Sequence, residues 1–173
     1  MDQHSAALPV ARTTLVILMI LNWVFGGCVL VLLIATIVAP QWTFPALGIP
    51  ASSWMMPMMQ GLRVIAVLGL VAIPLNHAIL RRLLAIVETV RAGDPFVASN
   101  ADRLQAIAWV LLTLQLLSIV IGGIGKAIST SAHPLHLGAG FSTSGWLAVI
   151  LTFVLARVFA AGTLMRQELE GTV

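Results

Sequence analysis

The sequence predicts an all-α polytopic membrane protein with four transmembrane helices and a cytoplasmic helical hairpin extension between the second and third. Of the 173 residues 60% are hydrophobic and only 9% are charged, whereas a soluble domain has about 25% charged residues. Four apolar runs reach the roughly 17–25 residues that a helix needs to cross a bilayer. A polar, turn-forming stretch separates the second run from the third. The length favours a single domain over 1–173 without a soluble module.

The first two apolar runs predict transmembrane helices over 13–39 and 61–80. No charged residue stands between Arg12 and Arg63. The first run is far longer than the roughly 7–15 residues of a cleaved signal peptide's core, so we expect it to be retained. The connection over about 40–59 is rich in proline and tryptophan, and we expect it to lie along the outer membrane surface.

The polar stretch predicts a helical hairpin over 81–103. Apolar residues at helical spacing continue the second helix beyond the lipid, with charged residues on its other face. Gly93 can end that helix in the left-handed conformation, and Pro95 cannot continue it. Asn100 suits the N-cap of the third helix. The apolar positions are Leu80, Leu83, Leu84, Val87 and Val90, and the charged ones are Arg81, Arg82, Glu88 and Arg91.

The third and fourth apolar runs predict transmembrane helices over 104–126 and 144–165. Small residues recur every fourth position along the fourth span, and Ser118 and Gly122 repeat this spacing once on the third. Close approach of backbones through small residues holds helices together in lipid. The ridge could serve packing within the chain, which we favour, or a homo-oligomer. Its members are Ala148, Thr152, Ala156 and Ala160.

The arginines and lysines predict the orientation in the membrane. Six of the nine lie on one side of the predicted spans and Arg157 lies near that end of the fourth span, whereas only Arg63 and Lys126 lie at the other side. Cytoplasmic segments carry the excess of Lys and Arg. We therefore expect a multi-pass protein of the inner membrane with the hairpin and both termini in the cytoplasm. Trp42, Trp54 and Trp146 then fall near the outer interface, where tryptophan is enriched.

No pattern for catalysis is present, so we do not expect an enzyme. The six acidic residues all lie outside the spans, and the sequence has no phosphate-binding glycine loop and no zinc-protease motif. No short window of the sequence is rich in Lys or Arg, so we do not expect direct nucleic-acid binding. Cys28 is the only cysteine, so the chain cannot form an internal disulfide.

Two short motifs are candidate metal sites. "HPLH" supplies His133 and His136, and "WMMPMM" supplies four methionines; thioethers and imidazoles could together hold Cu(I). Both stretches equally suit an interfacial loop, so we predict no metal. A b-type haem would need paired histidines within the spans, and His77 is the only one there. We therefore predict no cofactor.

Four polar residues within the spans form a possible intramembrane track: Asn22, His77, Gln115 and Arg157. Polar groups in lipid are costly and often functional. Such residues could bind an anion or respond to protonation. Alternatively, the amides bond across helices and the Arg157 side chain extends to the headgroups. We favour the second interpretation.

Two segments resemble a bacterial family of four-helix membrane proteins known as domain of unknown function twenty-nine seventy-five. The segments are "GDPFVASNADRLQAIAW" (93–109) and the C-terminal stretch 141–173 with its Phe159-x-x-Gly162 step. Members often carry an acid just before that glycine, where this chain has Ala160 and Ala161. The resemblance implies an integral membrane protein without an established reaction. It also implies that the gene for this chain lies beside a gene for a small helix-turn-helix regulator.

These observations favour a non-enzymatic regulatory or sensory membrane protein that contacts a cytoplasmic DNA-binding partner through the hairpin. The alternatives are a component of a small-molecule channel or transporter that uses the polar track, and a structural accessory subunit of a larger membrane complex. In all three cases the bilayer surrounds the spans. The expected partner-contact residues are Arg91, Asp94, Phe96 and Arg103.

Overall fold

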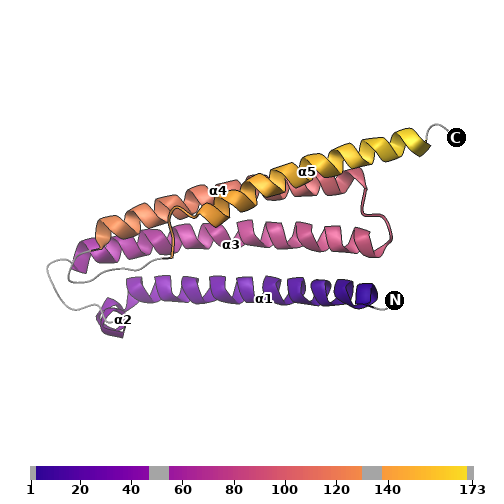
Figure 1. The fold of residues 1–173 in the computed structure, drawn as a ribbon. Coiled ribbons are helices and arrows are strands. Elements are labelled where there is room, and N and C mark those ends of the chain that lie inside the picture. Colours follow the sequence, from indigo (N-terminus) through magenta and orange to yellow (C-terminus); the bar gives the residue numbers. More distant parts are fainter. Residues whose placement is uncertain (1–2, 47–54, 130–137, 171–173) are drawn as a thin grey trace. The chain divides into compact units, whose positions relative to one another are not determined.

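The computed structural model describes residues 3–46, 55–129 and 138–170, and its elements confirm the all-α class. No strand occurs among these residues. Figure 1 shows the helices in chain order. They are α1 (Gln3–Val38), α2 (Pro40–Ala46), α3 (Met55–Arg91), α4 (Ala98–Ile128) and α5 (Thr143–Glu170).

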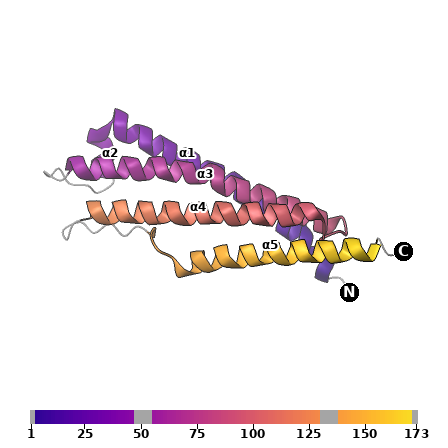
Figure 2. The ribbon, with the colours of Figure 1, turned by 90° about the horizontal axis from the view of Figure 1, so that it is seen from above.

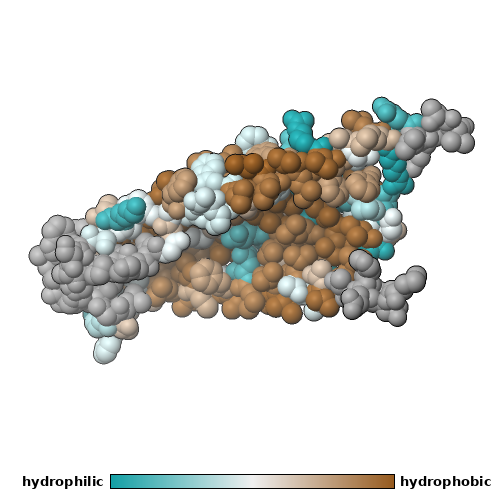
Figure 3. Space-filling model, in the orientation of Figure 1, coloured by the Kyte–Doolittle hydropathy of each residue, from teal (hydrophilic) through white to brown (hydrophobic). Residues whose placement is uncertain are grey.

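Four of these helices are long and apolar enough to cross a membrane. The candidate spans are Leu8–Val38, Met58–Arg91, Ala98–Ile128 and Thr143–Arg166. Large apolar side chains such as Phe25, Val120 and Leu151 are exposed along them, and Figure 3 shows apolar surface on the visible face. Exposed apolar surface of this extent needs lipid around it. The chain is therefore a multi-pass membrane protein.

The helices extend beyond the predicted spans. The helix that contains the predicted span 61–80 continues to Arg91, as the amphipathic pattern of its last turns predicts. The predicted outer loop begins with α2, where the Trp42 side chain is 77% exposed. Residues 47–54, with Trp54, lie outside the described part of the chain.

The chain divides into two compact units. Unit 1 comprises Met1–Asn22, Leu75–Thr113 and Thr143–Val173, and unit 2 comprises Trp23–Pro74 and Leu114–Ser142. α1, α3 and α4 each contribute to both units, whereas α5 belongs to unit 1.

In unit 2, one face of α4 holds the chain segment 138–142 that leads to α5. A Cβ atom on Gly122 would lie 2.6 Å from the Gly140 Cα atom and 2.7 Å from the Ala139 carbonyl oxygen. Ser118 lies one turn earlier; its Oγ accepts a hydrogen bond from the Gly140 N–H at 3.1 Å. The predicted small-residue pair Ser118 and Gly122 thus receives an incoming backbone segment.

In unit 1, the buried side of α5 follows a seven-residue repeat through Val149, Ala156 and Thr163. Of the predicted ridge, Ala156 is buried, Thr152 and Ala160 are half-buried and Ala148 is exposed. A strict four-residue spacing turns by about 40° per step around a helix of 3.6 residues per turn. The ridge therefore leaves the buried side at its first member.

Candidate functional site

The candidate site is built around the elbow, residues 92–97, which joins α3 to α4 in unit 1. Gly93 has a φ of 88°, as predicted for a glycine that ends a helix. Its N–H donates to the Val90 carbonyl at 3.1 Å, and the Asp94 N–H donates to the Thr89 carbonyl at 3.2 Å. This pair of bonds is a Schellman motif, which closes the last turn of α3 and reverses the chain.

Asn100 holds the two helices of the hairpin together, and the prediction that it caps α4 is wrong. α4 begins at Ala98, two residues earlier. The fully buried Asn100 amide donates to the Thr89 Oγ1 at 2.7 Å and to the Pro95 carbonyl at 2.9 Å. Its oxygen accepts from the Arg103 Nη1 at 2.7 Å. The Asn100 side chain therefore bonds to α3, to the elbow and to Arg103 at once, and these bonds fix the geometry of the turn.

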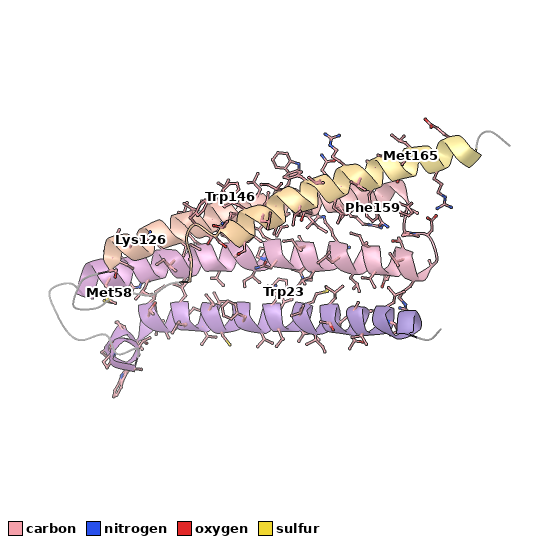
Figure 4. The ribbon with its side chains drawn as sticks, in the orientation of Figure 1. Trp23, Met58, Lys126, Trp146, Phe159 and Met165 are labelled. Atoms are coloured by element: carbon pink, nitrogen blue, oxygen red, sulfur yellow. The ribbon has the colours of Figure 1, made fainter. Side chains whose placement is uncertain are left out.

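The elbow also contacts α5 through an aromatic pair. The rings of Phe96 and Phe159 have centroids 5.5 Å apart and planes tilted by 31°. Phe159 lies on the side of α5 that faces the hairpin (Figure 4). One turn further along, a Cβ atom on Gly162 would lie 3.3 Å from the Phe96 ring. Because Gly162 has no side chain, the ring of Phe96 has room to lie against α5.

A second contact between the elbow and α5 is an ion pair. The Arg166 guanidinium donates to the Asp94 carboxylate. Their side chains are 44% and 41% exposed, so water and salt screen the attraction.

α4 and α5 also contact each other through an aromatic pair. The rings of Trp109 of α4 and Phe153 of α5 meet edge to face, with centroids 5.3 Å apart. Figure 2 shows α4 and α5 side by side in this region.

We call this arrangement the elbow junction: Arg91, Asp94, Phe96, Asn100 and Arg103 on the hairpin with Phe159, Gly162 and Arg166 on α5. Of the four predicted contact residues, Asp94, Phe96 and Arg103 take part in its contacts, and Arg91 lies beside them at the end of α3. Arg91 is exposed, and Phe96 keeps 44% of its surface exposed despite its ring contact. Arg103 is half-buried against Asn100. The accessible edge therefore consists of Arg91, Asp94, Phe96 and Arg166.

The sequence pattern did not predict the α5 half of this junction. In the sequence, Phe159 and Gly162 stand out only as a spaced pair, and Arg166 is only one of the cations that predict the orientation. Contacts between residues more than sixty positions apart leave no local periodic signal. The available hint was the spacing itself, because a glycine one turn after an aromatic residue opens a notch beside that ring.

The four residues of the predicted intramembrane track divide between the units: Asn22, His77 and Arg157 belong to unit 1 and Gln115 to unit 2. The Gln115 amide donates to the Ser142 carbonyl at 3.4 Å, so it helps to hold segment 138–142 on α4. Arg157 is exposed beside Phe153, Val154 and Val158 on the surface of α5. This setting suits a side chain that extends along apolar surface.

The two motifs weighed as metal sites fall largely outside the described residues. His133 and His136 lie there, as do the side chains of Met55 and Met56. Among the residues that the structure describes, no group of three or more His, Cys, Asp or Glu side chains is placed to hold a metal ion.

Comparison of the chain with family models, with curated proteins and with solved structures gives no match.

Proposed function

We propose that the chain is a non-enzymatic protein of the bacterial inner membrane, with the elbow and both termini in the cytoplasm. In this role it acts as the regulatory membrane partner of a cytoplasmic DNA-binding protein. The resemblance of residues 93–109 and 141–173 to the four-helix family supports this role. It also supports a small helix-turn-helix regulator as the partner.

The distribution of charge supports the proposed orientation. The segments of unit 1 carry seven of the nine cationic residues, whereas those of unit 2 carry only Arg63 and Lys126. Cytoplasmic ends of membrane helices carry the excess of Arg and Lys. The end of the hairpin that bears the elbow is therefore the cytoplasmic one in this proposal.

The observation that carries the proposed partner contact is the accessible edge of the elbow junction. A half-exposed phenylalanine stands beside an exposed arginine and a half-exposed ion pair. Aromatic and arginine side chains are enriched at protein interfaces. The hydrogen bonds of the buried Asn100 connect the turn to α3, and a turn that is already ordered loses little conformational entropy when a partner binds.

Co-purification with a helix-turn-helix regulator encoded beside the gene, as the family resemblance implies, tests the partner contact. We expect Arg91→Glu to weaken binding by about tenfold, since it reverses a charge at the edge. Arg81→Glu is the matched control, because Arg81 is also an exposed arginine of α3 but lies outside the junction. Equal binding by the native chain and Arg91→Glu, or no binding by the native chain, would contradict the proposal.

The orientation can be tested with the single native cysteine. Cys28→Ser gives a cysteine-free background, into which Ser99→Cys is introduced at an exposed position of α4 beside the elbow. A membrane-impermeant maleimide should label this cysteine only after the cells are opened. Labelling in intact cells would place the elbow outside and overturn the orientation.

A further inference from the structure

Unit 2 contains an apolar groove between α1 and α3. The groove has a volume of ≈ 270 Å³, and its walls are formed by side chains between Phe25 and Thr36 on α1 and between Leu62 and Gly69 on α3. Among the described residues that line it, Arg63 is the one that carries a charge. The two helices approach closely beside it, since a Cβ atom on Gly26 would lie 3.1 Å from the Ile73 side chain.

Arg63 is tied to the end of α1 by a carbonyl that a proline leaves free. In an α-helix the Thr36 carbonyl would accept from the N–H of residue 40, but Pro40 has no N–H. The Arg63 Nη2 donates to that carbonyl instead. This bond fixes the guanidinium at the level of Thr36, at one end of the groove.

The Arg63 guanidinium has more donors than the described residues use. Its Nε atom is buried, and no described residue accepts a hydrogen bond from it. A guanidinium offers five N–H donors in a planar fork that matches a phosphate in two-point contact. A cation inside an apolar wall is costly unless an anion or further acceptors satisfy it.

The groove has the depth of one lipid leaflet. From Phe25 to Thr36 an α-helix rises by about 16 Å, which is roughly half of a 30 Å hydrocarbon core. Both walls lie in candidate membrane spans. An acyl chain that fills the groove would therefore bring its headgroup to the end that Arg63 occupies.

We propose that this groove binds a phospholipid with an anionic headgroup, with one acyl chain against α1 and α3 and the phosphate at the Arg63 guanidinium. The apolar walls favour the acyl chain, and the Arg63 guanidinium favours a negative headgroup over a zwitterionic one. This site is independent of the elbow junction and of the regulator proposed above.

Native mass spectrometry of the detergent-purified chain, titrated with phosphatidylglycerol or phosphatidylcholine, tests the proposal. We expect about tenfold tighter binding of phosphatidylglycerol, since one charge-assisted hydrogen bond contributes at least that factor. Arg63→Gln should abolish this preference. Arg63→Lys, which keeps the charge but loses the fork, should retain part of it, and this variant serves if Arg63→Gln does not fold.

A substitution at Gly69 tests the contribution of the groove to lipid binding separately from that of the Arg63 charge. Gly69 lines the groove, and a Cβ atom there meets no atom within 4 Å; Gly69→Leu should fill the space and weaken binding of both lipids. Gly27→Leu is the matched control, because Gly27 also has open space but does not line the groove. Equal binding of the two lipids by the native chain would overturn the proposal, as would unchanged binding by Gly69→Leu. A lipid-free dimer that Gly69→Leu dissociates would also overturn it, by identifying a second copy as the occupant.

Discussion

The elbow junction of unit 1 and the contact between α4 and segment 138–142 in unit 2 connect distant parts of the chain by different means. At the elbow, the contacts are directional: the hydrogen bonds of the buried Asn100, an ion pair and a tilted pair of phenylalanine rings. In unit 2, the Gly122 backbone lies against that of Gly140, and the Ser118 hydroxyl bonds to the same glycine. The elbow contact depends mainly on side chains, and the contact in unit 2 depends mainly on a close approach of two backbones.

The distribution of charge explains the difference. The segments of unit 1 contain all six acidic residues and most of the arginines, and those of unit 2 contain only two cations. In lipid, helices gain no hydrophobic energy by associating, so close packing of small residues provides the stabilisation. Where water reaches the chain, directional hydrogen bonds shielded from it define the geometry. We therefore expect unit 2 to be sensitive to added volume and the elbow junction to lost hydrogen bonds.

The largest effect is expected at Gly122. Gly122→Ala would place a Cβ atom 2.6 Å from the Gly140 Cα atom, and a backbone cannot move aside as a flexible side chain can. We expect the free energy of unfolding to fall by about 3 kcal/mol, the upper end of the usual range for overpacking. The change is measurable by unfolding in mixed detergent and SDS micelles.

The neighbouring Gly123 is the control for this substitution. A Cβ atom on Gly123 meets nothing within 4 Å, and alanine is favoured over glycine within a helix by up to about 1 kcal/mol. Gly123→Ala should therefore leave stability unchanged or raise it. If the two variants unfold alike, the close approach of α4 to segment 138–142 does not stabilise the protein.

The second largest effect is expected at Asn100. Asn100→Ala removes the acceptor of Arg103 and leaves the Pro95 carbonyl without its donor. We expect a loss of about 2 kcal/mol, since an unsatisfied buried polar group costs about 1–3 kcal/mol. The same unfolding assay measures it, with Ser99→Ala at an exposed neighbouring position as the control. Equal stability of both variants would show that the hydrogen bonds of Asn100 do not hold the hairpin.

Features fixed by short stretches of chain were predictable from the sequence. The four apolar helices follow from composition and run length, and the positive φ of Gly93 follows from a glycine at the end of an amphipathic helix. Asn100 shows the limit of such reasoning. The same residue type suits a helix cap and a buried hydrogen-bonding centre, and only the three-dimensional positions of Thr89 and Arg103 decide between the two.

Features that depend on long-range contacts were not predictable. Nothing near Phe96 in the sequence identifies Phe159 as its partner, and nothing near Gly122 identifies Gly140. On α5, the four-residue ridge was predicted from residue size alone. The buried side instead passes through Val149 and Thr163, because the neighbouring elements and not residue size determine which side is covered.

A smaller effect is expected at Gly93, which tests the backbone of the elbow without its side-chain contacts. A Cβ atom there meets nothing within 4 Å, but the φ of 88° disfavours any L residue with a side chain. We expect Gly93→Ala to lower the free energy of unfolding by about 1–2 kcal/mol. Gly93→Asn should cost less, because asparagine adopts the left-handed conformation more readily. Equal losses for the two variants would indicate that the helix end does not require this conformation.

The smallest effect is expected for the ion pair between Asp94 and Arg166. Both side chains are more than 40% exposed, so solvent screening limits their coupling to roughly 0.2–1 kcal/mol. A double-mutant cycle with Asp94→Asn and Arg166→Gln measures that coupling directly. It should decrease further as ionic strength rises, because salt screens exposed charges. A coupling above about 2 kcal/mol that is insensitive to salt would place the pair away from water, and water would then not distinguish the elbow junction from unit 2.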